Sequence, residues 1–132
     1  MVLTLDARDR RPIYQQIADG IKALIARGEL REGMALPSVR QVAGDLGVNL
    51  NTIAVAYRQL QDEGFVSVRH GAGAVVSSQR AAQPAGEDLE RALRAVLTEW
   101  ILAGSSDREI LSAVERELHS LRRGGGKHDG SK

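Results

Sequence analysis

Residues 36–60, LPSVRQVAGDLGVNLNTIAVAYRQL, contain two short helical patterns with almost no sequence between them. Ser38 and Gln41 have the spacing of a capping box, so a helix is expected to begin after Ser38, and Gly47 suits its end. Asn49 is a good N-cap for the next helix. Two short helices joined by so tight a glycine-containing turn predict a helix-turn-helix.

The apolar residues of this stretch recur at the spacing of a buried helix face. In the first helix they are Val39, Val42, Ala43 and Leu46, and in the second they are Ile53, Ala56, Tyr57 and Leu60. The opposite face of the second helix then presents Asn51, Thr52, Val55 and Arg58. This second helix is the candidate recognition helix.

The flanking sequence extends the pattern. Residues 12–27 predict a helix with one apolar face, and residues 65–69 and 74–77 have strand-like content around a turn at residues 70–73. A β-hairpin placed directly after the recognition helix is a wing. We therefore predict an α+β fold with a winged helix-turn-helix over residues 1–80.

The rest of the chain predicts a helical hairpin over residues 85–122, reached through a linker and followed by a disordered glycine-rich tail at residues 123–132. A lone pair of helices cannot bury both of its apolar stripes, and an exposed patch of this size usually marks an interface. Two hairpins from two chains would form a four-helix bundle. The residues expected in this dimer interface are Leu89, Leu93, Leu97, Trp100, Ile110, Val114 and Leu118. The alternative is that the hairpin folds back on its own winged helix.

Composition limits the classes of protein to which this chain can belong. The chain has 132 residues and no cysteine, so disulfides and thiolate metal sites are excluded and a reducing compartment is expected. The N-terminus lacks the apolar core of a signal peptide, and no apolar run approaches the roughly 18 residues that span a bilayer. We therefore expect a cytoplasmic protein with no membrane partner.

Catalysis finds no support in the sequence. The histidines His70, His119 and His128 have no ligand-like spacing, and the glycine runs lack the features of a phosphate loop. We therefore expect neither an enzyme nor a bound metal or cofactor. The sequence does not indicate whether a small-molecule effector exists.

Charge gives little support for nucleic-acid binding on its own. The chain carries 18 Lys and Arg against 17 Asp and Glu, and residues 1–80 carry 10 basic and 8 acidic side chains. The strong basic footprint of many nucleic-acid-binding proteins is missing. Any DNA binding must therefore come from where the arginines lie.

Four segments, LPSVRQVAGDLGV, NTIAVAYRQL, EGFV and HGAG, resemble the GntR family of bacterial regulators. The short C-terminal hairpin is similar to that of the YtrA-type subfamily, which lacks a large effector domain. The resemblance implies a dimeric DNA-binding repressor, often of a transporter operon. A two-fold dimer is expected to bind a pseudo-palindromic operator in double-stranded DNA.

The recognition helix of such a protein enters the major groove with its N-terminal residues at the base edges. Asn51 can then read adenine, and Thr52 can bond base or phosphate. Arg58, nearly two turns further on, can reach the phosphate backbone. The alternative is that all three are ordinary solvated side chains.

Two apolar residues depart from the family pattern on this face. Leu50 stands where relatives often have arginine or proline, and Val55 where many carry arginine or lysine. Both remove positive charge, but each can touch a thymine methyl group. Alternatively, Leu50 packs against the turn.

Further candidates lie outside the recognition helix. Arg40 occupies a motif position where family members place a DNA-contacting arginine, and a surface salt bridge to Asp45 or Glu63 is the alternative. Asn49 is first a cap, and by the resemblance it also approaches phosphate.

The wing offers Arg69, His70 and Gly71 as minor-groove contacts, because glycine lets the backbone approach and a cation meets enhanced negative potential there. An ordinary hairpin turn would also explain the glycines. Family wings often carry lysine or arginine where this chain has Ala72.

A rival function belongs to another class. A winged helix can serve protein–protein interaction, with the hairpin as a scaffold. The near-neutral charge and the apolar Leu50 and Val55 also fit that reading.

Overall fold

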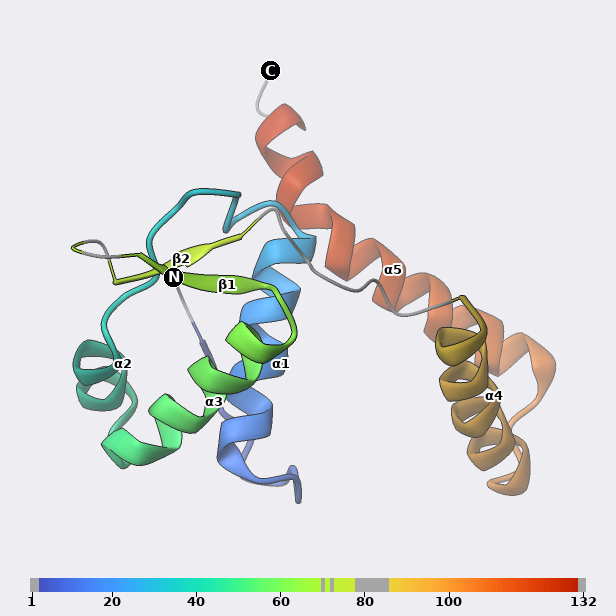
Figure 1. Ribbon diagram of the computed structural model, residues 1–132. Helices are drawn as coiled ribbons and strands as arrows, with labels where there is room; N and C mark the ends of the chain where they lie inside the picture. The colour runs from blue at the N-terminus through green and yellow to red at the C-terminus, as the bar shows by residue number, and fades with distance from the viewer. Residues whose placement is uncertain (1–2, 70, 72, 78–85, 131–132) are drawn as a thin grey trace.

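The computed structural model describes residues 3–69, 71, 73–77 and 86–130, and of residues 123–130 it describes the backbone alone. The elements are α1 (Ile13–Ala26), α2 (Val39–Leu46), α3 (Leu50–Asp62), β1 (Val66–Arg69), β2 (Gly73–Val76), α4 (Gly86–Leu102) and α5 (Asp107–Gly130). Figure 1 shows three helices and a β-hairpin grouped together, with α4 standing apart from them. This is the predicted winged helix followed by two C-terminal helices.

The tight turn between α2 and α3 forms as its sequence predicts. The Ser38 hydroxyl oxygen accepts a 3.0 Å hydrogen bond from the backbone N–H of Gln41. Gly47 closes α2 with a φ of 68°, in the left-handed region that glycine adopts without strain. The Asn49 side chain then accepts a 2.7 Å bond from the backbone N–H of Asn51 and begins α3. These local bonds fix where the recognition helix α3 starts.

The hydrophobic core lies where α1 and α2 pack against α3. The largest of the fully buried side chains come from α1 and α3, and they are Ile17, Ile21, Leu24, Ile53 and Leu60. The wing strands close the core with Val66 and Val76. Burial of these side chains, at roughly 1.5–3 kcal/mol each, holds α3 with one face inward and one face outward.

The wing contains a third extended segment that the sequence did not predict. β1 and β2 pair antiparallel with Val66 opposite Val76. The connector between α1 and α2 adds to the free edge of β2, because the N–H of Val76 donates to the Met34 carbonyl and that of Leu36 donates to the Ala74 carbonyl. The wing is therefore tied to the chain just before α2.

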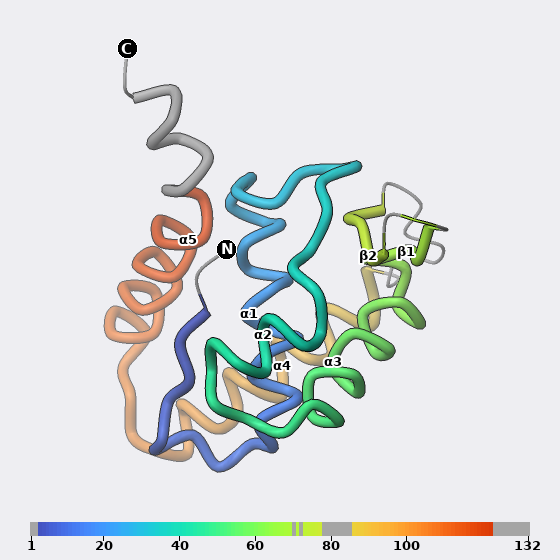
Figure 2. Tube along the Cα trace, turned by 90° about the vertical axis from the view of Figure 1, so that its left-hand side faces the viewer, coloured from blue at the N-terminus to red at the C-terminus, as the bar shows by residue number. Residues whose placement is uncertain are grey.

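The two C-terminal helices follow the predicted positions but do not pack along each other. A reciprocal capping box begins α5, in which the N–H of Ser106 donates to the Glu109 carboxylate and that of Glu109 to the Ser106 hydroxyl. α5 lies against α1, whereas α4 makes no extensive contact with any other described element. Figure 2 shows α5 on one side of the winged helix and the wing on the other.

Two expectations for the C-terminal region need correction. The helix α5 continues to Gly130, so the backbone of residues 123–130, within the segment predicted to be disordered, is helical. Once a helix exists, each added residue gains a hydrogen bond, so an established helix can extend into a poor sequence. Ile110, assigned to the dimer interface, is buried within the chain with 7% of its surface exposed.

Among the described residues, no helix is both long and apolar enough to cross a membrane.

Candidate nucleic-acid interface

The outward face of α3 carries most of the predicted site. Asn51 and Arg58 are exposed, and Thr52 is half-buried. Leu50 is 42% exposed and Val55 38% exposed, so Leu50 does not bury itself in the turn. The face is held outward because Ile53, Ala56, Tyr57 and Leu60 are all buried on the other side of the helix. The predicted separation into buried and exposed residues holds along α3 except at Thr52, which is half-buried.

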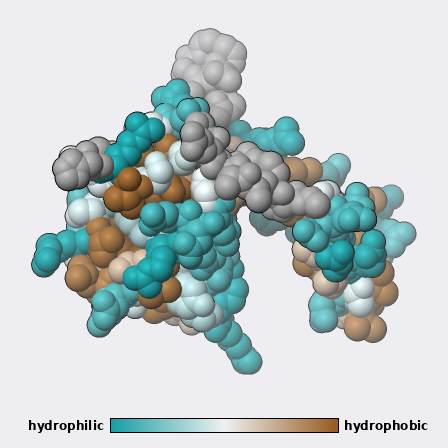
Figure 3. All heavy atoms as spheres, viewed as in Figure 1, coloured by the Kyte–Doolittle hydropathy of each residue, from teal (hydrophilic) through white to brown (hydrophobic). Residues whose placement is uncertain are grey.

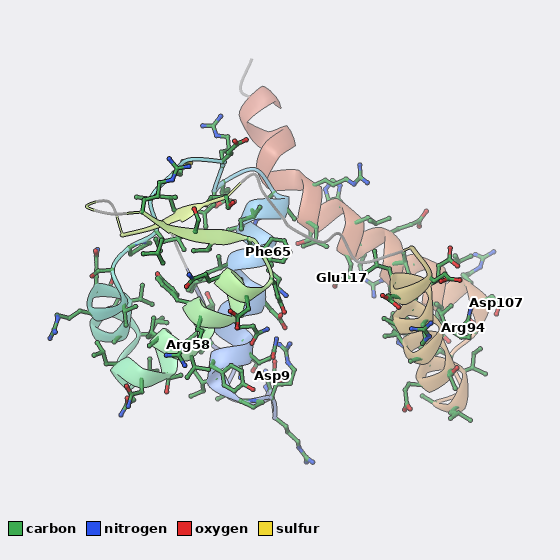
Figure 4. The ribbon with its side chains drawn as sticks, viewed as in Figure 1. Asp9, Arg58, Phe65, Arg94, Asp107 and Glu117 are labelled. Atoms are coloured by element: carbon green, nitrogen blue, oxygen red, sulfur yellow. The ribbon has the colours of Figure 1, made fainter. Side chains whose placement is uncertain are left out.

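Three exposed arginines lie on α3 and on two elements that pack against it. Arg40 lies in α2, Arg58 in α3 and Arg69 in β1, and all are exposed. Within the described part of the chain none of them forms an ion pair, and Glu63 pairs instead with Lys22 at 2.6 Å. The salt bridge considered for Arg40 is therefore not formed here. Figure 4 shows Arg58 projecting from α3.

The tip of the wing is described in part. Arg69 pairs with Gly73 at the end of the ladder, and Gly71 adopts a φ of 83°. A residue with a Cβ would be strained at that φ, so a glycine is needed for the turn itself. His70 lies outside the described residues. The turn thus explains Gly71 without any ligand.

A shallow apolar groove separates the start of α2, the middle of α3 and the wing. Its volume is about 390 Å³. Its walls include Val39, Ala54 and Val68, with Arg58 at its side. Figure 3 shows apolar side chains between hydrophilic ones on this face. The three elements that carry the arginines therefore meet around one depression.

One hydrogen bond crosses between these elements. The Tyr57 hydroxyl donates to the Pro37 carbonyl oxygen at 2.7 Å, and Tyr57 is 8% exposed. The sequence predicted that Tyr57 is buried but did not predict this bond. The available signal was the residue type, because a buried tyrosine usually finds a partner for its hydroxyl. Burial raises the pKa of Tyr57 to about 12.

This pKa predicts a loss of stability at alkaline pH. In the unfolded chain tyrosine ionises near its ordinary value of about 10, whereas the folded chain keeps Tyr57 neutral up to about 12. The free energy of unfolding is therefore expected to fall as pH rises from about 10 to 12, by up to about 2–3 kcal/mol from this group. Urea unfolding of wild type and Tyr57→Phe across that range measures it. Equal pH dependence in the two proteins would contradict this account.

The groups on this face are suited to binding. Among the described residues, no group of three or more His, Asp or Glu side chains is placed to hold a metal ion. What the face does offer is hydrogen-bonding amides, exposed arginines and apolar contacts. Those are the groups that read base edges and phosphates.

Comparison with known proteins relates this architecture to a family of regulators. Residues 13–76 match the family model described as bacterial regulatory proteins, gntR family. The repressor YtrA of Bacillus subtilis is 37% identical over 76 residues, which cover 58% of each chain. The regulator YhcF of the same species is 37% identical over 109 residues, covering 80% of this chain and 88% of YhcF. The structure of YtrA from Sulfolobus acidocaldarius has a TM-score of 0.54 and 37% identity, covering 88% of this chain and 96% of that one.

The matches differ in how much of each relative they cover. The match to Bacillus subtilis YtrA spans less than two thirds of that protein. The match to YhcF and to the Sulfolobus structure extends beyond the winged helix into the C-terminal helices. The chain therefore belongs to the GntR family of helix-turn-helix regulators, and it is YtrA-like within that family.

Proposed function

We propose that the protein is a cytoplasmic, homodimeric repressor that binds a pseudo-palindromic operator and controls a transporter operon or a neighbouring one. The observation that carries DNA binding is the outward face of α3, which presents Asn51, Val55 and Arg58 from a helix anchored by four buried residues. Arg40 and Arg69 lie on α2 and β1, which pack against α3, and they form no ion pair within the described residues. The family of the chain and the name of its relative YtrA, a transcriptional repressor, support the same function.

The chemistry of this face favours A·T base pairs. The commonest specific contact is arginine to guanine, and no arginine lies among Leu50, Asn51, Thr52 and Val55 at the start of α3. Asn51 can bond adenine, and the exposed Leu50 and Val55 can contact thymine methyl groups. We therefore propose an A·T-rich sequence under α3. Arg40 on α2 can still reach a guanine at the edge of the site.

The proposal that two chains pair through their C-terminal helices depends on the exposed surface of α4. None of its residues is buried, and the stripe of Leu89, Leu93 and Val96 is 50–59% exposed. In proteins most helical stability comes from the packing of an apolar face, and that of α4 is uncovered in the single chain. We propose that a second copy of the chain covers it, because the stripe recurs on α5 at Leu118 and Leu121 and two such pairs complete a four-helix bundle.

A gel-shift titration with fragments of the source genome, at low and at moderate salt, tests the function. A sequence-selective shift that weakens as salt rises is the expected result. The rival function, a winged helix for protein–protein contact, predicts no such shift. Exposed Leu50 and Val55 would then form part of a protein-binding surface.

The exposed arginines are expected to act mainly on phosphate. Replacing Arg40 or Arg58 with alanine should weaken binding to all DNA sequences by similar factors, and it should flatten the dependence of log affinity on log salt by about 1. Titrations at four salt concentrations measure that slope. An arginine whose loss changes sequence preference while the slope stays the same would instead be a base-reading residue.

The dimer sets the geometry of the operator. Two-fold symmetry is expected to place two half-sites about one helical turn apart, roughly 10 base pairs from centre to centre. Footprinting of the bound operator shows this spacing directly. Protection of one asymmetric half-site by a single chain would contradict the proposed pairing.

A further inference from the structure

The start of α2, the middle of α3 and the wing are joined through one side-chain hydroxyl. Tyr57 of α3 donates to the carbonyl oxygen of Pro37, the residue just before the N-cap Ser38 of α2. The same connector pairs with the wing, where the N–H of Leu36 donates to the Ala74 carbonyl. A single bond from α3 therefore reaches the point where α2 and the wing are both attached.

The surroundings of this bond make it important for the position of the start of α2. Tyr57 and Pro37 both line the groove between the three elements, so side-chain packing does not fill that space completely. Further along α2, Val42 and Ala43 belong to the core, whereas Val39 at its start is only partly buried against the core. The N-terminal end of α2 thus depends on the bond to Tyr57 more than the remainder of the helix does. Arg40 lies at that end, in the second position of α2.

We propose that Tyr57 is a positioning residue for DNA recognition, whose hydroxyl sets Arg40 on α2 relative to Asn51 on α3 so that both reach one half-site. This inference rests on the proposed function and adds a residue that does not itself touch DNA. Binding groups need to be held within about 0.5 Å of their working geometry by supporting hydrogen bonds. Asn51 and Arg58 lie on the same helix as Tyr57 and keep their places without the bond.

The substitution Tyr57→Phe separates these roles. The ring stays in the core while the Pro37 carbonyl loses the hydroxyl donor. The start of α2 keeps the packing of Val39 and the bond from Leu36 to the wing, but it loses its side-chain link to α3. We expect it to shift, which weakens the contact of Arg40 and leaves that of Arg58 unchanged. Arg58 follows Tyr57 directly in α3, so it is a stringent internal control. Tyr14→Phe removes the hydroxyl of a half-buried tyrosine outside this junction and serves as the matched control.

A double-mutant cycle on the full chain tests the inference, with operator affinity measured well below the melting temperature of each variant. Arg40→Ala is expected to weaken binding about tenfold in wild type and about threefold or less in Tyr57→Phe, since coupled residues depart from additivity. The salt slope should fall by about 1 on losing Arg40 in wild type and much less in Tyr57→Phe. The effect of Arg58→Ala should be the same in both backgrounds, within about twofold.

Each outcome bears on one of the two claims. Additivity of Tyr57→Phe and Arg40→Ala within about twofold would overturn the positioning role, even if Tyr57→Phe lowers stability. An Arg40→Ala variant that binds like wild type would overturn it too, because no contact would remain to be positioned. Wild-type protein without salt-sensitive, sequence-selective binding would overturn the proposed function itself.

Discussion

Replacing Trp100 with alanine is expected to raise the dissociation constant of the dimer by about thirtyfold or more. Trp100 lies on the same stripe of α4 as Leu89, Leu93 and Val96, since successive members are three or four residues apart. It is half-buried in the single chain, so part of its ring remains for a partner. Tryptophan dominates many interfaces, and loss of such an anchor costs about 2 kcal/mol or more. Sedimentation-velocity runs over a range of concentrations measure the change.

The opposite face of α4 supplies the control. Leu102 is 76% exposed and lies on the far side of the helix from Trp100, at 100° per residue. Leu102→Ala removes apolar surface of a similar kind and should leave the dimer intact. Equal effects of the two substitutions, or a dimer untouched by Trp100→Ala, would show that the chains do not pair through this stripe.

Replacing Asn51 with alanine is expected to cost about 1–3 kcal/mol of binding free energy on the true operator and much less on random DNA. The side chain is exposed at the start of α3 and can form two bonds with adenine. Alanine keeps the backbone N–H that donates a hydrogen bond to the Asn49 side chain, so the start of the helix is preserved. Fluorescence anisotropy with both DNAs at one salt concentration gives the two losses.

The comparison between the two DNAs is the internal control. A variant that merely folds less well loses affinity for operator and random DNA by the same factor. Equal losses would therefore remove Asn51 from the base-reading face. They would also leave the proposed preference for A·T pairs without its main contact.

The parts of the fold that could be predicted from sequence are governed by local bonds. Ser38, Gly47 and Asn49 act within four residues of themselves, and each has the role that its residue type predicts. The exposed face of α3 was predictable for a related reason, because helical periodicity assigns each residue to a side. Thr52 is the partial exception, since it is half-buried near the edge of that face.

The parts that escaped prediction depend on long-range contacts. The connector that ends in Leu36 pairs with β2 some forty residues later along the chain, and its sequence has no strand-like alternation. The Tyr57 hydroxyl meets a carbonyl twenty residues away. Periodicity shows that Tyr57 faces inward, but it does not show which atom accepts the hydrogen bond from its hydroxyl. The same limit applies to Ile110, whose residue type fits an intrachain contact as well as a dimer interface.

The most direct test of the central claim is selection of bound sequences from a random DNA library by the full-length protein. The account predicts enrichment of a pseudo-palindrome with two A·T-rich half-sites about 10 base pairs apart, and the enrichment should disappear in Asn51→Ala. A motif with a G·C core under α3, or no enrichment over the starting library, would contradict the assignment of the outward face of α3 as the surface that reads DNA.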